Sequence, residues 1–258
     1  MSLADFLQGG HLERADIVLV CGTNLFGRVI RWATNSPFSH AALVFLVADQ
    51  TDGFERSFVI EAEPKGVSIR GVDYLVAALD NHPQAAVAVL RFAPDWFTPD
   101  MRKRVRGRML EFIQADYDWG AVLRIAWSVT AGRVLGAERI AADFQQGLKT
   151  SYAARQLAPG NFICSGLIQY GFLRAVQDFA NQYCPVGDVV FDNDLLGHSP
   201  QALLDANPAA RARLLAITPE TLSRSKALQY KYLIHQGQVH AISSRDEVVA
   251  ALGKGRHP

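Results

Sequence analysis

The chain has few cysteines, little net charge and no long apolar segment, and each shortage excludes a class of protein. Its 258 residues contain three cysteines, Cys21, Cys164 and Cys184, without a C-x-x-C pair, so neither a disulfide scaffold nor a cysteine-based zinc site is expected. The formal net charge of +1 gives no indication of a nucleic-acid partner. The longest clean apolar run, Ala41 to Ala48, is too short to cross a bilayer. Apolar residues still make up 49% of the chain, which is enough for a substantial core.

The N-terminal residues carry no targeting pattern. Residues 1–8 lack a basic stretch followed by an apolar run, so no signal peptide is predicted. A reducing cytoplasm is the default expectation for location, and export by a route that needs no N-terminal signal is the alternative. Residues 1–14 are predicted to be a polar lead-in. Because no repeat, low-complexity linker or domain boundary is evident, we predict a single domain over residues 1–258.

The first half of the chain is predicted to be rich in strands, because short apolar runs alternate with turn residues. Strands are expected over 15–21, 39–47, 58–62, 65–70 and 86–91. The segment 26–33 between the first two is expected to be a short amphipathic helix. Its predicted apolar face holds Phe26, Val29, Ile30 and Ala33, and its polar face holds Arg28 and Arg31.

The second and third of these strands are predicted to pair as a hairpin. If the loop spans about six residues, 48–53, Val47 faces Phe54 and His40 lies directly opposite Glu61 on the same face. A slip of one residue would move the two side chains to opposite faces. The hairpin therefore predicts a histidine–carboxylate pair, provided that the register holds.

The second half of the chain is predicted to be mostly helical. Thr98 and Pro99 mark a helix start, and the polar face of that helix is basic. The basic residues are Arg102, Lys103, Arg104, Arg106 and Arg108. Such a face is most often solvated, and the alternative is contact with an acidic lipid headgroup or partner protein. The segment Ala121 to about Val134 is expected to be an apolar helix, either in the core or beside an acyl-binding groove, and 138–158 a helix and loop.

Cys164 is the candidate nucleophile. Apolar residues follow it at helical spacing: Leu167, Ile168, Phe172 and Val176. Asn161 and Ser165 both favour a helix start, which places Cys164 in the first turn. There the unpaired backbone N–H groups and the helix dipole favour an anion and lower the pKa of a thiol. The alternative is a small, inert core residue.

A cysteine nucleophile needs a base, and the base needs a third group that holds it in position. His40 at a strand start and Glu61 on the next strand are the candidates for these roles. Each has an alternative, because His40 alone is more often a structural histidine and Glu61 alone more often faces solvent. No metal or other cofactor is expected, since the histidines lack i,i+4 pairing and Asp192 and Asp194 lack the rest of a calcium loop.

Taken in order, these segments resemble the YiiX/YaeF-type permuted papain-like amidases of the NlpC-type cysteine hydrolase superfamily. The matching segments are 15–20, 26–32, Ser36–Val44, Val59–Ala62 with Gly66 and Val67, Tyr117 with Asp118, and Phe162–Ser165. The resemblance spans about residues 14–230 and implies a papain-like core there. After it, the apolar runs 229–234 and 239–242 around Gln236 and Gly237 predict a C-terminal hairpin, which with the tail covers about 229–258. It implies an α+β, circularly permuted papain-like (NlpC-type) fold. In that fold an antiparallel sheet or half-barrel packs on helices, and the nucleophile lies at a helix N-terminus.

The resemblance also implies roles for individual residues. Cys164 is expected to be the nucleophile, His40 the base and Glu61 the residue that orients it. Ser39, Tyr117 and Ser165 belong to the same motifs and are expected to bind substrate. The implied chemistry is hydrolysis of amide, peptide or acyl bonds through a thioester, without a metal.

Three functional classes stay open from the sequence. The first is the cysteine hydrolase, whose partner is a substrate with an amide or acyl group, such as a peptide or lipid. The second is a lipid-directed acyltransferase or phospholipase that uses the same Cys164 and His40 pair, with peripheral membrane contact through the basic helix face. The third is a non-catalytic binding module. No nucleic-acid partner is expected, and the sequence leaves the oligomeric state open.

Overall fold

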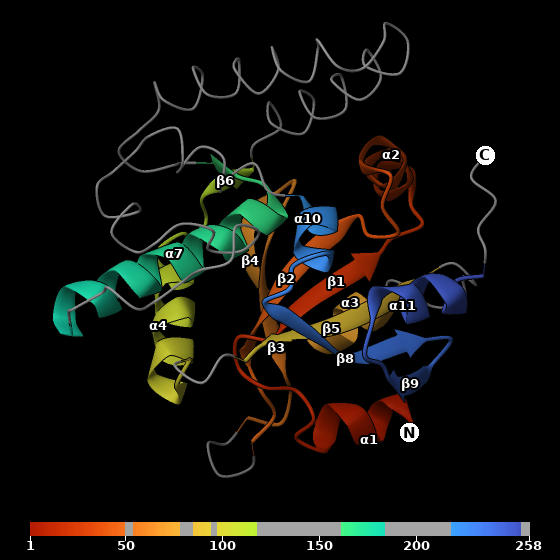
Figure 1. Cartoon of the computed structure of the whole chain (residues 1–258), viewed down its shortest axis with the longest axis horizontal. Helices are drawn as coiled ribbons and strands as arrows, with labels where there is room; N and C mark the ends of the chain where they lie inside the picture. The colour runs from red at the N-terminus through yellow and green to blue at the C-terminus, as the bar shows by residue number, and fades with distance from the viewer. Residues whose placement is uncertain (50–53, 78–84, 94–96, 118–160, 184–217, 254–258) are drawn as a thin grey trace, which may run out of the picture.

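The computed structural model describes residues 1–49, 54–77, 85–93, 97–117, 161–183 and 218–253. These residues form an α+β structure around a seven-stranded antiparallel sheet with the strand order β4-β3-β2-β1-β5-β8-β9 (Figure 1). The α+β class predicted from the sequence is confirmed. The expected helices over 121–134 and 138–158, and the pair Asp192 and Asp194, lie outside the described residues.

The strands of the sheet begin and end within two residues of the segments predicted from apolar runs. They are β1 (Ile17–Cys21), β2 (His40–Leu46), β3 (Phe58–Glu63), β4 (Gly66–Gly71), β5 (Ala86–Phe92), β8 (Leu228–His235) and β9 (Gln238–Ala241). The expected C-terminal hairpin is β8–β9, and β8 pairs with β5, so this hairpin continues the main sheet. A separate parallel pair joins β6 (Asp116–Tyr117) to β7 (Asn161–Phe162).

Seven helices are described in these parts of the chain. They are α1 (Leu3–Gln8), α2 (Leu25–Thr34), α3 (Val72–Ala77), α4 (Pro99–Leu110), α7 (Cys164–Tyr183), α10 (Pro219–Ser223) and α11 (Arg245–Ala251). The expected cap of α4 is confirmed, because the Thr98 side chain accepts a hydrogen bond from the N–H of Met101. Within the described residues, no helix combines the length and apolarity needed to span a bilayer.

The prediction of a polar lead-in over residues 1–14 is wrong, since α1 occupies part of it. Ser2 caps this helix by accepting a hydrogen bond from the N–H of Asp5. Phe6 is fully buried and packs in the sheet core that also contains Val87 and Val89 of β5. Burial of one aromatic side chain therefore anchors a segment whose composition looks like that of a loop.

Side chains alternate between the two faces of the sheet and fill two cores. Ile17 and Leu19 of β1 point to the face covered by α4 and α7, whose Met101 and Leu167 lie in the same core. Val18 of β1 points to the other face, where the side chains of α1 and α3 cover the sheet. Because both faces are covered, β1 is buried along its whole length, as its continuous apolar sequence indicates.

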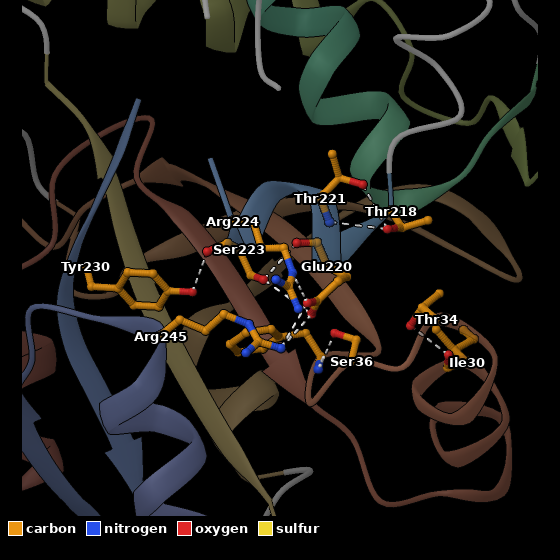
Figure 2. Close-up of polar contacts among 11 residues, drawn as sticks. Ile30, Thr34, Ser36, Thr218, Glu220, Thr221, Ser223, Arg224, Tyr230 and Arg245 are labelled. Atoms are coloured by element: carbon orange, nitrogen blue, oxygen red, sulfur yellow. Dashed lines mark hydrogen bonds and ion pairs between the residues drawn. The ribbon is translucent and has the colours of Figure 1, made fainter. Parts of the chain in front are cut away.

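A cluster of charged side chains fixes the short helix α10 against the C-terminal elements (Figure 2). The carboxylate of Glu220 accepts hydrogen bonds from Nε of Arg224 and from Nη2 of Arg245, the latter at 2.9 Å. The Oγ of Ser223 donates to the backbone carbonyl of Glu220, and the Tyr230 hydroxyl donates to the carbonyl of Ser223 at 2.8 Å. These contacts join α10 to α11 and β8, and α10 in turn contacts α7.

Candidate active site

The β2–β3 hairpin brings His40 and Glu61 together, but not in the predicted register. Glu61 lies opposite Ala42 rather than His40, and Phe54 pairs with Asp49 rather than Val47. Both partners thus lie two residues later in the chain than predicted. Because alternate residues of a strand share a face, a shift of two residues keeps His40 on the same side as Glu61. The predicted register is therefore wrong, and the predicted contact is present.

The imidazole of His40 and the carboxylate of Glu61 form a short hydrogen bond. His40 Nε2 lies 2.6 Å from Glu61 Oε2. The Glu61 side chain is fully buried, whereas that of His40 is 22% exposed. A buried carboxylate at this distance fixes the ring orientation and stabilises its protonated form. With Nε2 engaged, Nδ1 is the ring nitrogen left for the thiol.

Cys164 lies in the first turn of α7, as predicted, and is its first residue, but the helix does not begin as expected. Asn161 lies in β7, opposite Asp116 of β6, so this short ladder holds residues 161–162 in an extended conformation. Ile163 precedes the helix, and its carbonyl accepts the N–H of Leu167. Pairing with β6 thus outweighs the helix-starting tendency of Asn161, and the helix starts at the cysteine itself.

The helix α7 packs on β2 and β3, and this contact places the thiol beside His40. Cys164 is 5% exposed. Its Sγ accepts hydrogen bonds from the backbone N–H groups of Ala41 and Ser165 and shares one with the His40 side chain. The strand that carries the imidazole and the helix that carries the thiol therefore both supply N–H donors to the sulfur.

The charges of His40 and Cys164 stabilise each other. Burial alone would raise the pKa of the Cys164 thiol, but protonated His40 and the N–H donors of Ala41 and Ser165 outweigh it and lower that pKa. Burial would lower the pKa of His40, but the Cys164 thiolate and the Glu61 carboxylate outweigh it and raise that pKa to about 10. The geometry therefore favours a thiolate–imidazolium ion pair at neutral pH.

Two charged residues beside Glu61 were not anticipated from the sequence. Arg70 Nε lies 3.7 Å from Glu61 Oε1, and Arg70 Nη2 forms an ion pair with Glu63. Glu63 lies two residues after Glu61 on β3, and Arg70 lies diagonally across on β4, since Ser68 is the residue opposite Glu61. Two carboxylates at i and i+2 on one strand, followed by an arginine on the next strand, are the pattern in the sequence that could have indicated this charge cluster. Arg70 thus balances the buried negative charge next to His40.

The three residues expected to bind substrate have different surroundings. Ser39 is buried, and its Oγ accepts the N–H of Gly22 at 2.9 Å and donates to the carbonyl of Val20. This contact braces the end of β1 against the residue that precedes His40. Ser165 is buried beside the nucleophile, and its N–H donates to the thiol. Tyr117 lies in β6, and its side chain is outside the described part of the structure.

Cys21, the other thiol among the described residues, does not join this site. Cys21 is fully buried at the end of β1, and burial raises its pKa to about 12, so it is a poor nucleophile. Cys184, His82 and His198 lie outside the described residues. Within the described ranges, no group of three or more His, Cys, Asp and Glu side chains is placed to hold a metal ion. We therefore derive no step through a metal.

Comparison with known proteins finds similarity to solved structures alone. No protein-family model matches the chain, and no curated protein matches it. Among solved structures, the chain is similar to the crystal structure of metalloprotein yiiX from Escherichia coli O157:H7, with 13% identity and a TM-score of 0.47. The similarity covers 85% of this chain and 96% of that protein. We base the proposed function on the side chains of this chain.

Proposed function

We propose that the protein is a cysteine-dependent hydrolase that cleaves amide, peptide or acyl bonds through a thioester on Cys164. The observation that carries the proposal is the series of contacts from buried Glu61 through His40 to Cys164 at the start of α7. The lowered pKa of the thiol supports its role as nucleophile, and the raised pKa of the imidazole supports its role as proton donor. Neither role needs a bound cofactor.

In the acylation step the Cys164 thiolate attacks the carbonyl carbon of the substrate, and a C–S bond forms while the carbonyl electron pair moves to oxygen. Backbone N–H groups in the first turn of α7 have no acceptor within the helix and stabilise this oxyanion. When the intermediate collapses, the bond to the leaving nitrogen or oxygen breaks. Protonated His40 gives its proton to that leaving group, and the acyl group stays on sulfur as a thioester.

In the deacylation step neutral His40 takes a proton from water as the water oxygen attacks the thioester carbon. The C–S bond then breaks, the carboxylic acid leaves, and the thiolate–imidazolium pair forms again. Glu61 stays ionised throughout and holds the ring in the orientation that serves both steps. The second step thus restores the charge distribution of the resting site.

The chain order of these residues supports a circularly permuted papain-like arrangement of the NlpC type. The strand that carries the base comes first, the strand that carries its orienting carboxylate follows, and the helix that carries the nucleophile comes last. The seven-stranded sheet packs on that helix through β2 and β3. An antiparallel sheet that presents histidine and carboxylate to a helix-start cysteine is the geometry this proposal requires.

The proposal is tested by trapping the acyl-enzyme. Purified protein is incubated with activated esters and acyl amides of different chain lengths, quenched in acid and weighed by mass spectrometry. A single acyl adduct on the peptide that contains Cys164 is expected, and Cys164→Ala should abolish both adduct and turnover. Cys21→Ala serves as the matched control and should keep both. Turnover that survives Cys164→Ala would refute the proposal, and absence of any adduct across the set would favour a binding module.

A further inference from the structure

The helix α2 carries an apolar stripe that faces away from the protein. Leu25 is 79% exposed, Val29 44% and Trp32 42%. With 3.6 residues per turn, these three side chains fall within about 60° of arc on the helix surface. The sequence predicts Val29 on the packed face, and the structure corrects this, because α2 is rotated so that Gly27 is buried instead. The ten-residue helix thus leaves three large apolar side chains partly or largely exposed.

The charges on α2 all have one sign. Arg28 is exposed and lies next to the stripe. Arg31 lies about 60° beyond Arg28 around the helix axis, on the side away from the stripe. Among the described residues Arg28 has no ion-pair partner, and Arg31 donates to the carbonyl of Gly22 at 3.4 Å. The helix contains no aspartate or glutamate. The stripe is therefore bordered by positive charge that α2 itself does not neutralise.

The position of α2 relates it to the candidate active site. The helix connects the end of β1 to the start of β2, where His40 lies, so it stands at the same end of the sheet as the thiol. In Figure 1 it is set apart from the sheet, beyond the tip of β1. Gly22 directly follows β1 and Ser39 directly precedes β2, and the N–H of Gly22 donates a hydrogen bond to Ser39 Oγ. This bond holds together the two residues that flank the segment containing α2. A surface that contacts α2 therefore lies at the end of the sheet that carries His40.

We propose that α2 docks the protein on an anionic lipid bilayer, with Leu25, Val29 and Trp32 at the level of the headgroups and Arg28 on the lipid phosphates. An aromatic and aliphatic stripe bordered by arginine is the composition of helices that lie in a membrane interface. An anionic bilayer supplies both phosphates for Arg28 and an apolar layer for the stripe, whereas an acidic protein surface would supply the charge without that apolar layer, so the proposal commits to an anionic bilayer. The docking itself does not depend on the proposed hydrolase activity, although it would bring lipid acyl groups to Cys164.

The test is co-sedimentation of the full chain with vesicles of phosphatidylcholine alone and of phosphatidylcholine mixed with phosphatidylglycerol. Binding to the mixed vesicles is expected, with much weaker binding to the neutral ones and weakening by salt. Arg28→Glu should reduce affinity for the mixed vesicles about tenfold, because each basic side chain near an anionic surface favours binding several-fold. The double variant Leu25→Ser with Val29→Ser should reduce binding to both kinds of vesicle.

Matched controls come from α4, which carries an exposed leucine and an exposed lysine. Leu110, 41% exposed, is replaced in Leu110→Ser, and Lys103→Glu makes the same charge reversal as Arg28→Glu. Both controls should bind vesicles like the wild type, and all variants should unfold at a similar temperature. Failure of the wild type to sediment with mixed vesicles would overturn the proposal. Loss of binding only in the α4 variants, or a dimer in solution that the α2 variants dissociate, would overturn it as well.

Discussion

Alkylation of Cys164 measures the ion pair directly, and His40→Ala is the variant that removes it. In the wild type, protonated His40 lowers the pKa of the thiol against the effect of burial. Without the imidazole, burial dominates, and the pKa returns to at least its ordinary value of 9.0. A thiol with that pKa is about 1% ionised at pH 7 at most, so the variant contains at least roughly 100-fold less thiolate than a fully ionised wild type.

The expected change in rate is smaller than the change in ionisation. A thiolate of lower basicity is intrinsically less nucleophilic, with a Brønsted coefficient of about 0.5, which offsets roughly threefold in rate for each pKa unit by which the wild-type thiol lies below that of the variant. Alkylation of Cys164 by iodoacetamide at pH 7 should therefore fall about tenfold in His40→Ala. The wild-type rate should be nearly flat across neutral pH, whereas the variant rate should rise about tenfold per pH unit up to pH 9.

The assay is peptide-resolved mass spectrometry under limiting reagent, which follows all three cysteines in one sample. Cys21 is an internal control, because burial keeps it slow in every variant. His240→Ala, which removes an exposed histidine on β9, is the matched substitution and should leave the Cys164 rate unchanged. Equal rates and equal pH profiles for the wild type and His40→Ala would show that His40 does not activate the thiol.

Three further substitutions test the surroundings of the site. Glu61→Gln removes the charge that raises the pKa of His40, so the alkaline limit of activity should move to lower pH and the acylation rate should fall roughly 10- to 100-fold. Gly22→Ala would place a methyl group 2.7 Å from Ser39 Oγ, and we expect about 1–2 kcal/mol less stability together with a slower acylation rate. Glu220→Gln should lower the free energy of unfolding by about 2 kcal/mol in a urea titration, because it leaves Arg245, whose side chain is only 22% exposed, without its carboxylate.

Each of these predictions has a control and a contrary outcome. Gly107→Ala adds a methyl group where no atom lies within 4 Å and should raise stability by about 0.5–1 kcal/mol. Arg224→Ala removes a side chain that is 62% exposed, so its cost should stay below about 1 kcal/mol. An unchanged pH profile in Glu61→Gln would show that Glu61 does not tune His40. A larger loss of stability in Arg224→Ala than in Glu220→Gln would show that the contact between Glu220 and Arg245 is not the one that stabilises this part of the protein.

The sequence predicted the strands and the pairing of His40 with Glu61 because both depend on local patterns. Continuous apolar runs bounded by turn residues mark buried strands, and a period of two keeps a histidine and a carboxylate on one face under any even shift. The true register, with Ala42 opposite Glu61, depends on how the hairpin closes at Asp49 and Phe54 and on a register shift between Val44 and Leu46. No local pattern encodes those features.

Contacts between distant segments account for the features that the sequence did not reveal. The pairing of Asn161 with Asp116 moves the start of α7 to Cys164, and the burial of Phe6 turns an apparent lead-in into α1. The orientation of α2, with Val29 outward, is decided by what packs beneath it rather than by its own periodicity. Arg70 beside Glu61 was detectable only once the β3–β4 register was known.

The placement of β8 next to β5 has a consequence for synthesis on the ribosome. β5 pairs with β1 on one side, and its other edge is covered only by β8, which lies more than a hundred residues later in the chain. At 5–20 residues per second, a nascent chain therefore carries an open apolar edge for roughly 7 to 27 seconds. Such an edge can pair with another chain, so the yield of correctly assembled protein should depend on chaperone supply and on growth temperature.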